Sequence, residues 1–259
     1  MDDADGELRG SLKEGRRKTF RLRFKEVTVD LVDFYNKWWS EKDDSVDYKR
    51  LSLIIGRVNP GDYVLQIDCG PGMLAKKLLE KGALVKATEI SQVGMERARK
   101  KGIDVVQVDL DSERLPFPDE EFDVVISDSS IEHLFYSDRI LRECARVLKP
   151  GGKFILLLPN IAHWRFRLWL LFGRFPYIKN SPTDLSHIRF FTVSEARALC
   201  KREGLKVKEV DGSASVWVRG LYPWAFQIPP FKQVYTCLAR LFPSLLARDF
   251  ILVCEKSPF

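Results

Sequence analysis

The sequence predicts an α/β fold with a doubly wound, mostly parallel sheet. Short apolar runs alternate with amphipathic segments from Tyr63 onward, a pattern typical of parallel strands covered by helices on both faces. The first run ends in the glycine-rich turn 69–72, which opens a helix, and the second ends in the acid Glu89. A glycine turn followed by an acid at this spacing is typical of a site for a nucleoside-containing ligand.

The predicted elements follow a regular order. The apolar runs are expected to be strands, at 63–68, 84–89, 105–109, 122–126, 153–158, 206–210 and 250–254. Helices are expected at 72–81, 93–101, 137–148, 164–172 and 192–203, after an aromatic helical segment at 33–39. Pro150 and the glycines after it are expected to end the helix 137–148. Thr192 is expected to cap the helix 192–203, with Glu195 reaching back to it.

Composition places the chain among folded proteins of a reducing compartment. A hydrophobic fraction of 45% over 259 residues suffices for a buried core. The five cysteines are scattered without a Cys-x-x-Cys pair, which favours the cytoplasm and argues against a cysteine zinc site. The N-terminus lacks the apolar stretch of a secretory signal, and no run approaches the ~20 residues of a membrane span.

Five motifs carry a resemblance to a known family. They occur at 64–72, 87–91, 106–110, 122–128 and 146–152. In this order they resemble the motifs of class I S-adenosylmethionine-dependent methyltransferases. The tracts 159–165, 173–176 and 187–192 are similar to those of the branch that contains MetW-like proteins. The resemblance implies a Rossmann-like, seven-stranded sheet with an antiparallel last strand, helical and aromatic cap inserts, and S-adenosyl-L-methionine as cofactor.

On this basis we divide the chain into four parts. Residues 1–50 are expected to form a basic arm and an aromatic lid helix, and residues 51–158 the cofactor-binding core. Residues 159–192, the first insert, are expected to cap the substrate. Residues 193–259 complete the core and contain a second, irregular insert at about 214–248. For the aromatic helical segment, packing against the sheet is an equally open alternative to a lid.

The resemblance implies a cofactor site at the carboxyl ends of the strands, where open α/β sheets bind ligands. Gly70 and Gly72 would line its methionine and ribose end, and Glu89 would bind the ribose hydroxyls. Ile90 would pack on the adenine, and Asp109 would accept a hydrogen bond from the adenine amino group.

Three further residues complete the implied site. Leu110 would contribute its backbone to adenine binding. Ser127 and Asp128, at the end of the fourth strand, would face the sulfonium and the substrate.

The glycine motif departs from the family pattern at two positions. Gln66 stands where the family usually has an acid, and Asp68 stands where it usually has glycine. Aspartate tolerates left-handed backbone better than most residues. We expect the Asp68 carboxylate to hold the ammonium group of the cofactor in place of the missing acid. The opposite interpretation is that cofactor binding is weakened or lost.

Three histidines are the candidate bases. Methyl transfer from a sulfonium mainly needs alignment of the acceptor, but a hydroxyl acceptor also needs a base. His133 and His187 are equal candidates, and His163 is a weaker one, with Asp128 as a further candidate catalytic group. For each histidine, a structural hydrogen-bonding role is the alternative.

No metal site is expected. Some quinone O-methyltransferases, to which the chain is also similar, hold a divalent ion with two glutamates and a histidine after the fourth strand. In this chain Ser129 replaces the first of these glutamates, although Asp128 could substitute for it.

The basic, aromatic segment 164–179 has several interpretations. It could pack on the core as a substrate cap, form a homodimer surface, or rest on a membrane as an interfacial helix. Its basic residues could also meet a phosphate or carboxylate on the acceptor; they are Arg165, Arg167, Arg174 and Lys179.

The sequence therefore predicts a methyltransferase that acts on an oxygen, nitrogen or carbon nucleophile. The acceptor is expected to be a small molecule, a glycan or a lipid-linked precursor. The alternative is a MetW-like binding or regulatory partner that keeps the fold and does no chemistry. Nucleic acid is not expected as a partner, because the net charge of +6 is modest and no Asn-Pro-Pro-Tyr-type motif occurs.

Overall fold

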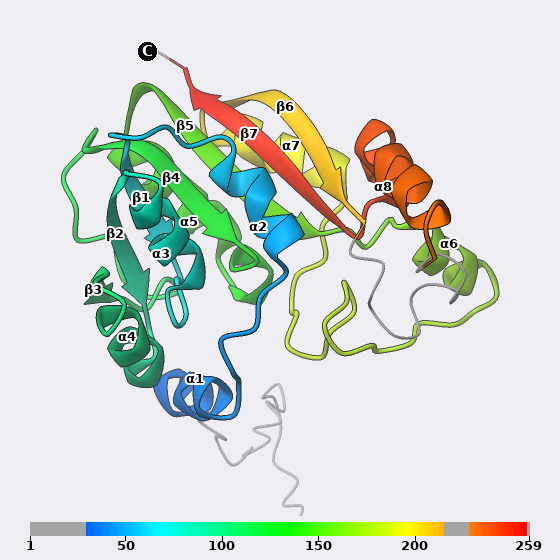
Figure 1. Ribbon diagram of the computed structural model, residues 1–259, viewed down its shortest axis with the longest axis horizontal. Helices are drawn as coiled ribbons and strands as arrows, with labels where there is room; N and C mark the ends of the chain where they lie inside the picture. The colour runs from blue at the N-terminus through cyan, green and yellow to red at the C-terminus, as the bar shows by residue number, and fades with distance from the viewer. Residues whose placement is uncertain (1–29, 215–227, 258–259) are drawn as a thin grey trace, which may run out of the picture. The chain divides into compact units, whose positions relative to one another are not determined.

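The computed structural model describes residues 30–214 and 228–257, and it contains one seven-stranded sheet (Figure 1). The strand order is β3-β2-β1-β4-β5-β7-β6. Strands β1 to β5 pair in parallel, whereas β7 is antiparallel to both β5 and β6. This topology confirms the predicted fold class. The basic arm before residue 30 and the part 215–227 of the second insert lie outside the described residues.

The strands lie close to their predicted positions. They are β1 Tyr63–Ile67, β2 Leu84–Glu89, β3 Asp104–Gln107, β4 Phe122–Asp128, β5 Leu148–Pro159, β6 Leu205–Ser213 and β7 Asp249–Lys256. Strand β5 begins earlier than expected. Its first residue, Leu148, still pairs with Phe122 of β4, and the register shifts before Lys153 pairs with Val124. The Pro-Gly-Gly turn is therefore an irregularity within the strand and not the linker before it.

The helical elements include four that the sequence analysis did not foresee. The helical elements are α1 Leu31–Ser40, α2 Tyr48–Ile55, α3 Met73–Glu80, α4 Gln92–Arg99, η1 Ile131–His133, α5 Ser137–Val147, α6 Trp164–Leu171, α7 Val193–Arg202, α8 Phe231–Leu241 and α9 Pro243–Leu246. The four unforeseen ones are α2, η1, α8 and α9. Thr192 caps α7 by accepting from the Glu195 amide at 3.1 Å, as predicted. Asp47 caps the unforeseen α2 in the same way.

Helices cover both faces of the sheet, because neighbouring strand residues point to opposite sides. On one face Leu65 and Ile67 pack in a cluster with residues of α5 and α7, such as Ile140. On the other face Val64 packs in a cluster with residues of α2, α3 and α4, such as Leu78. These apolar runs, buried on two sides, explain why the sequence pattern was nearly continuous rather than alternating.

The second insert contains helices α8 and α9, so the expectation that it is irregular was wrong. Helix α8 buries Tyr235 and Ala239 against Phe166 of α6 in a separate small core. Figure 1 shows α6 and α8 near the ends of β6 and β7. No helix of the described residues has the length and hydropathy needed to cross a membrane.

Candidate cofactor and substrate site

A cavity of about 690 Å³ lies at the carboxyl ends of the parallel strands. Its walls come from the turns after β1, β2, β3 and β4, from α1, and from the first insert. Strand β1 lies between β2 and β4, so the chain leaves β1 and β4 in opposite directions. Open α/β sheets bind ligands at such switch points, and the cavity therefore has the position that the sequence predicted for a cofactor.

Glu89 and the glycine turn form one wall of this cavity. The Glu89 carboxylate accepts from the Gly70 amide at 2.7 Å and from the Ser91 amide at 2.9 Å. Gly70 has φ +54°, a conformation that a residue with a Cβ rarely adopts. Burial raises the pKa of Glu89, while the bonds from these amides oppose that rise. The acid at the end of β2 is thus fixed beside the turn after β1.

Helix α1 covers the glycine turn. A Cβ on Gly70 would lie 2.6 Å from the Trp39 indole, whose side chain also opposes the rise in the pKa of Glu89. Asn36 anchors the helix, because its side-chain oxygen accepts from the Ser91 hydroxyl at 2.8 Å and from the Val93 amide at 3.2 Å. The aromatic segment therefore lies over the candidate site and contacts α4. The aromatic pattern of residues 33–39 predicts a helix, but it does not predict that Trp39 contacts Gly70.

Asp68 lines the cavity in a left-handed backbone conformation, with φ +48°. Its carboxylate accepts a short hydrogen bond from the Ser130 hydroxyl. Burial, followed by the nearby charge of Glu89, raises the pKa of Asp68 to about 8. A cation would relieve this crowding of acids. The shift of the acid from position 66 to position 68 therefore leaves a carboxylate in the cavity.

The residues predicted for the adenine end also line the cavity. Ile90 follows β2, and Asp109 and Leu110 follow β3. The Asp109 carboxylate accepts from the Asp111 amide at 2.9 Å and from the Ser112 hydroxyl at 2.6 Å. Each carboxylate oxygen has a further lone pair, so Asp109 can still accept from a ligand.

Two residues predicted for the site, Gly72 and Ser127, are not among the described residues that line the cavity. Gly72 packs against α4, and a Cβ there would lie 3.0 Å from the Ala98 Cβ. Ser127 is fully buried within β4, where it pairs with Ile67 and Leu156. Gly72 thus permits close helix packing, and Ser127 lies one residue short of the cavity.

Asp128 is held by an arginine that the sequence analysis did not single out. Arg50 of α2 contacts the two Asp128 carboxylate oxygens at 3.0 and 3.3 Å, and its guanidinium donates to the Ser129 hydroxyl at 2.7 Å. Burial raises the pKa of Asp128, and the charge of Arg50 opposes the rise. This ion pair joins α2 to the end of β4.

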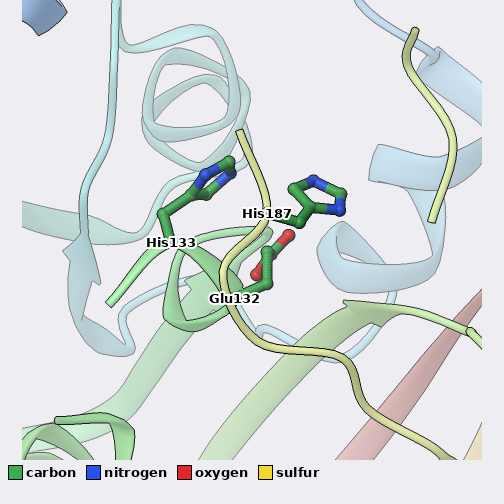
Figure 2. A group of neighbouring side chains, drawn as sticks. All are labelled: Glu132, His133 and His187. Atoms are coloured by element: carbon green, nitrogen blue, oxygen red, sulfur yellow. The ribbon is translucent and has the colours of Figure 1, made fainter. Parts of the chain in front are cut away.

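Glu132, His133 and His187, which all line the cavity, come together in one cluster (Figure 2). The two imidazole rings meet edge to face, with centroids 4.9 Å apart. Burial, with a smaller contribution from His187, lowers the pKa of His133 to about 4. Burial also lowers the pKa of His187. Both imidazoles are therefore neutral at neutral pH.

His163, the weakest candidate base, has a structural position. It is fully buried, its Nδ1 accepts from the Arg165 amide at 3.3 Å, and its Nε2 lies 3.0 Å from the Tyr235 hydroxyl. It thereby caps α6 and joins it to α8. Burial lowers its pKa to about 3, so the ring is neutral. It is not among the cavity-lining residues of the described chain.

The first insert contributes its second half to the cavity. Residues 179–181, 184 and 186–187 line it, whereas helix α6 is not among the lining residues of the described chain. Lys179 lies near Lys42, whose pKa is lowered to about 8 by burial and by the charge of Lys179, against the opposing effect of Asp184. Leu171 and Phe172 at the end of α6 are exposed. The membrane and dimer interpretations of segment 164–179 stay predictions.

A family model described as "Methionine biosynthesis protein MetW" matches residues 48–226. A ubiquinone/menaquinone biosynthesis C-methyltransferase from Laribacter hongkongensis is 38% identical over 117 residues, which are 42% of this chain and 48% of that protein. A ubiquinone biosynthesis O-methyltransferase from Pseudomonas fluorescens is 27% identical over 190 residues, 68% of this chain and 81% of that protein. The chain thus spans about half the length of the first of these relatives.

Solved structures show the same fold. A putative methyltransferase from Haloferax volcanii, in complex with the Trm112 activator, has a TM-score of 0.61 at 21% identity over 86% of this chain and 98% of that one. A possible histamine N-methyltransferase from Thermotoga maritima has a TM-score of 0.59 at 17% identity, over 88% of this chain and 100% of that one.

Proposed function

The chain belongs to the MetW family, and on that premise we propose that it is an S-adenosylmethionine-dependent methyltransferase. The acceptor would be an oxygen, nitrogen or carbon nucleophile of a small molecule, glycan or lipid precursor. One observation supports the proposal most strongly. The Glu89 carboxylate accepts a hydrogen bond from the Gly70 amide, and both residues line the same cavity. Named relatives are methyltransferases, which supports the same reaction class.

The cavity residues fit the cofactor. The space beside Gly70, which the Trp39 indole fills in this structure, is where a ribose would lie, and Glu89 would accept hydrogen bonds from its hydroxyls. Ile90 and Leu110 would pack on the adenine, and Asp109 would accept from its amino group. The cofactor supplies a methyl group already activated by the sulfonium, so the protein has to align the acceptor and exclude water.

Helix α1 has to adjust when a ribose binds. The Trp39 indole lies against Gly70 and interacts with Glu89, where the ribose is expected. We infer that Trp39 turns away from Glu89 and that α1 then covers the ligand as a lid. The same contact supports the second candidate function, a binding partner in which Trp39 permanently closes the cofactor site.

The acceptor end of the cavity favours a small molecule with an anionic group. Lys42 and Lys179 lie close together in the lining, and their charges would suit a carboxylate or phosphate on the acceptor. The neutral rings of His133 and His187 face the same space and can accept a proton or bind an ion. We do not propose Asp128 as the base, because Arg50 contacts both of its oxygens.

Calorimetric titration of the full chain with S-adenosylmethionine and with S-adenosylhomocysteine tests the proposed function. We expect one molecule of either ligand to bind per chain. Absence of binding to both in the wild type, together with binding in the Trp39→Ala variant, would favour the permanently closed partner. Absence of binding in both proteins would reject a cofactor site at this cavity.

Asp68 is expected to make cofactor binding depend on pH. A carboxylate that holds an ammonium group must be ionised, and the pKa of Asp68 is raised to about 8. Affinity for S-adenosylmethionine should therefore increase as the pH rises from about 6 to about 8, because a larger fraction of Asp68 is then ionised, and the change should be reversible. The titratable groups that face Asp68 are Glu89, Asp109, Asp111 and Tyr35.

The matched variant is Asp68→Asn, because asparagine tolerates the left-handed backbone at this position and alanine does not. Loss of a hydrogen-bonded charge costs about 1.5 to 3 kcal/mol, so we expect affinity to fall roughly 10- to 100-fold and the pH slope to flatten. Calorimetry at several pH values measures both effects. Unchanged affinity in the variant would show that Asp68 does not replace the missing acid.

A further inference from the structure

We propose that Glu132, His133 and His187 form a binding site for a divalent transition-metal ion. One ligand atom from each side chain lies within 4.8 Å of the others, and all three residues line the cavity. Figure 2 shows that Glu132 and His133 come from η1, whereas His187 comes from the neighbouring loop of the first insert. The expectation that the chain has no metal site considered only the residues after β4 and so omitted His187.

Both histidines are already oriented as metal ligands. The Nδ1 atom of His133 lies 2.9 Å from the Ser186 carbonyl oxygen, and that of His187 lies 3.1 Å from the Pro182 carbonyl oxygen. A carbonyl can only accept, so each Nδ1 carries the proton and each Nε2 keeps its lone pair. Metal-binding histidines in proteins commonly donate their other ring N–H to a carbonyl in this way.

Glu132 supplies the second, independent observation. The residue is 1% exposed, yet neither carboxylate oxygen has a hydrogen-bond partner on any other described residue. A buried carboxylate without partners is costly, and a bound cation is a common solution in proteins.

The backbone holds the third ligand in place. The Glu132 carbonyl oxygen accepts from the Ile188 and Arg189 amides, each at 3.0 Å. These bonds fix the insert loop that carries His187 directly against η1. A tetrahedral ion with bonds of about 2.1 Å holds its ligand atoms about 3.4 Å apart. Side-chain rotations that move each ligand atom by about an ångström would therefore bring the three atoms to the spacing of a bound ion, without movement of the backbone.

The ligand set selects the class of ion. Two imidazole nitrogens and one carboxylate oxygen suit Zn²⁺, Co²⁺ or Fe²⁺, whereas Mg²⁺ and Ca²⁺ prefer oxygen ligands alone. Three protein ligands leave a coordination position open. If the proposed function holds, this position faces the acceptor, and the ion would bind an acceptor oxygen and lower its pKa. Binding of the ion itself does not depend on methyl transfer.

Titration of the chelator-treated full chain with Zn²⁺ in a calorimeter, and with Co²⁺ followed by visible absorption, tests the site. We expect one ion per chain, visible Co²⁺ bands of a low-symmetry site with nitrogen ligands, and no competition from a moderate excess of Mg²⁺. His187→Gln and Glu132→Gln should each weaken Zn²⁺ binding by more than about 100-fold, because loss of even an outer-shell partner costs about 10- to 100-fold.

Two control variants each remove a side chain that can bind Zn²⁺ but lies outside the cluster. Cys237 is the exposed thiol, and His163 is a buried histidine outside the cluster, so Cys237→Ser and His163→Gln should bind Zn²⁺ like the wild type. Thermal unfolding without metal establishes that each variant is folded. The proposal is wrong if the wild type binds neither Zn²⁺ nor Co²⁺, or if both ligand variants bind as the wild type does.

A separate S-adenosylmethionine titration of metal-free protein distinguishes the two proposals. Metal binding without cofactor binding would leave the ion site standing and reject the proposed function. Cofactor binding without metal binding would reject the ion site and leave the proposed function standing.

Discussion

Replacing Glu89 by alanine is expected to weaken binding of S-adenosylhomocysteine by at least about 100-fold. The carboxylate would accept both ribose hydroxyls, and charged hydrogen bonds are worth about 1.5 to 3 kcal/mol each. Two such bonds correspond to roughly 3 kcal/mol or more, which is about two factors of ten in the dissociation constant. Calorimetric titration of the variant against the wild type measures the difference.

This variant needs two controls, because Glu89 also accepts from the Gly70 and Ser91 amides. Glu96→Ala removes an exposed acid from the neighbouring helix α4 and should leave the affinity unchanged. Glu89→Gln keeps the side-chain volume and one acceptor oxygen, so it separates loss of charge from collapse of the turn. Binding within about threefold of wild type in Glu89→Ala would mean that the ribose lies elsewhere.

Gly212→Val is expected to destabilise the fold by about 3 kcal/mol or more, the largest effect on stability that we foresee. A Cβ at this position of β6 would lie 2.6 Å from the Ala239 carbonyl oxygen and 2.6 Å from the Ala247 Cβ. Neither atom is at the end of a flexible side chain. Helix α8 and the end of α9 would therefore have to move away from the sheet. The midpoint of urea unfolding measures the loss.

The matched control places the same side chain at an exposed position of the same strand. Lys206→Val introduces valine into β6 where the residue faces solvent, and its free energy of unfolding should stay within about 0.5 kcal/mol of wild type. If Gly212→Val unfolds at the same urea concentration as Lys206→Val, the packing of α8 and α9 on β6 is looser than the structure shows.

Movement of α9 would also reach the cavity. Asn160, the residue after β5, donates from its side-chain amide to the carbonyl oxygens of Pro243 and Ala247 at 3.1 and 2.9 Å. The neighbouring residues Arg248 and Asp249 line the cavity itself. The packing of α9 therefore helps to hold this part of the cavity wall in place, because Arg248 and Asp249 directly follow Ala247 in the chain.

Most of the sheet could be predicted because its signals are local. Buried parallel strands need continuous apolar runs, and these gave all seven strands within a few residues except at β5. The turn after β1 and the acid after β2 could be read for the same reason, since each follows its strand directly. Helix α8 has a readable amphipathic period, with Tyr235 and Ala239 buried one turn apart, but it lies within the Trp-, Tyr- and Pro-rich stretch 214–248, which we expected to be irregular as a whole.

The sequence by itself determined the order of the seven strands along the chain and which polar residues and glycines follow them, from Gly70 and Asp68 to Glu89 and Asp109. Those residues lie in turns whose positions follow from short-range pattern. Only the tertiary structure decided that Trp39 covers Gly70, that Arg50 holds Asp128, and that His187 meets Glu132. Such contacts depend on where long connections return to the sheet, and no periodicity along the chain encodes that path.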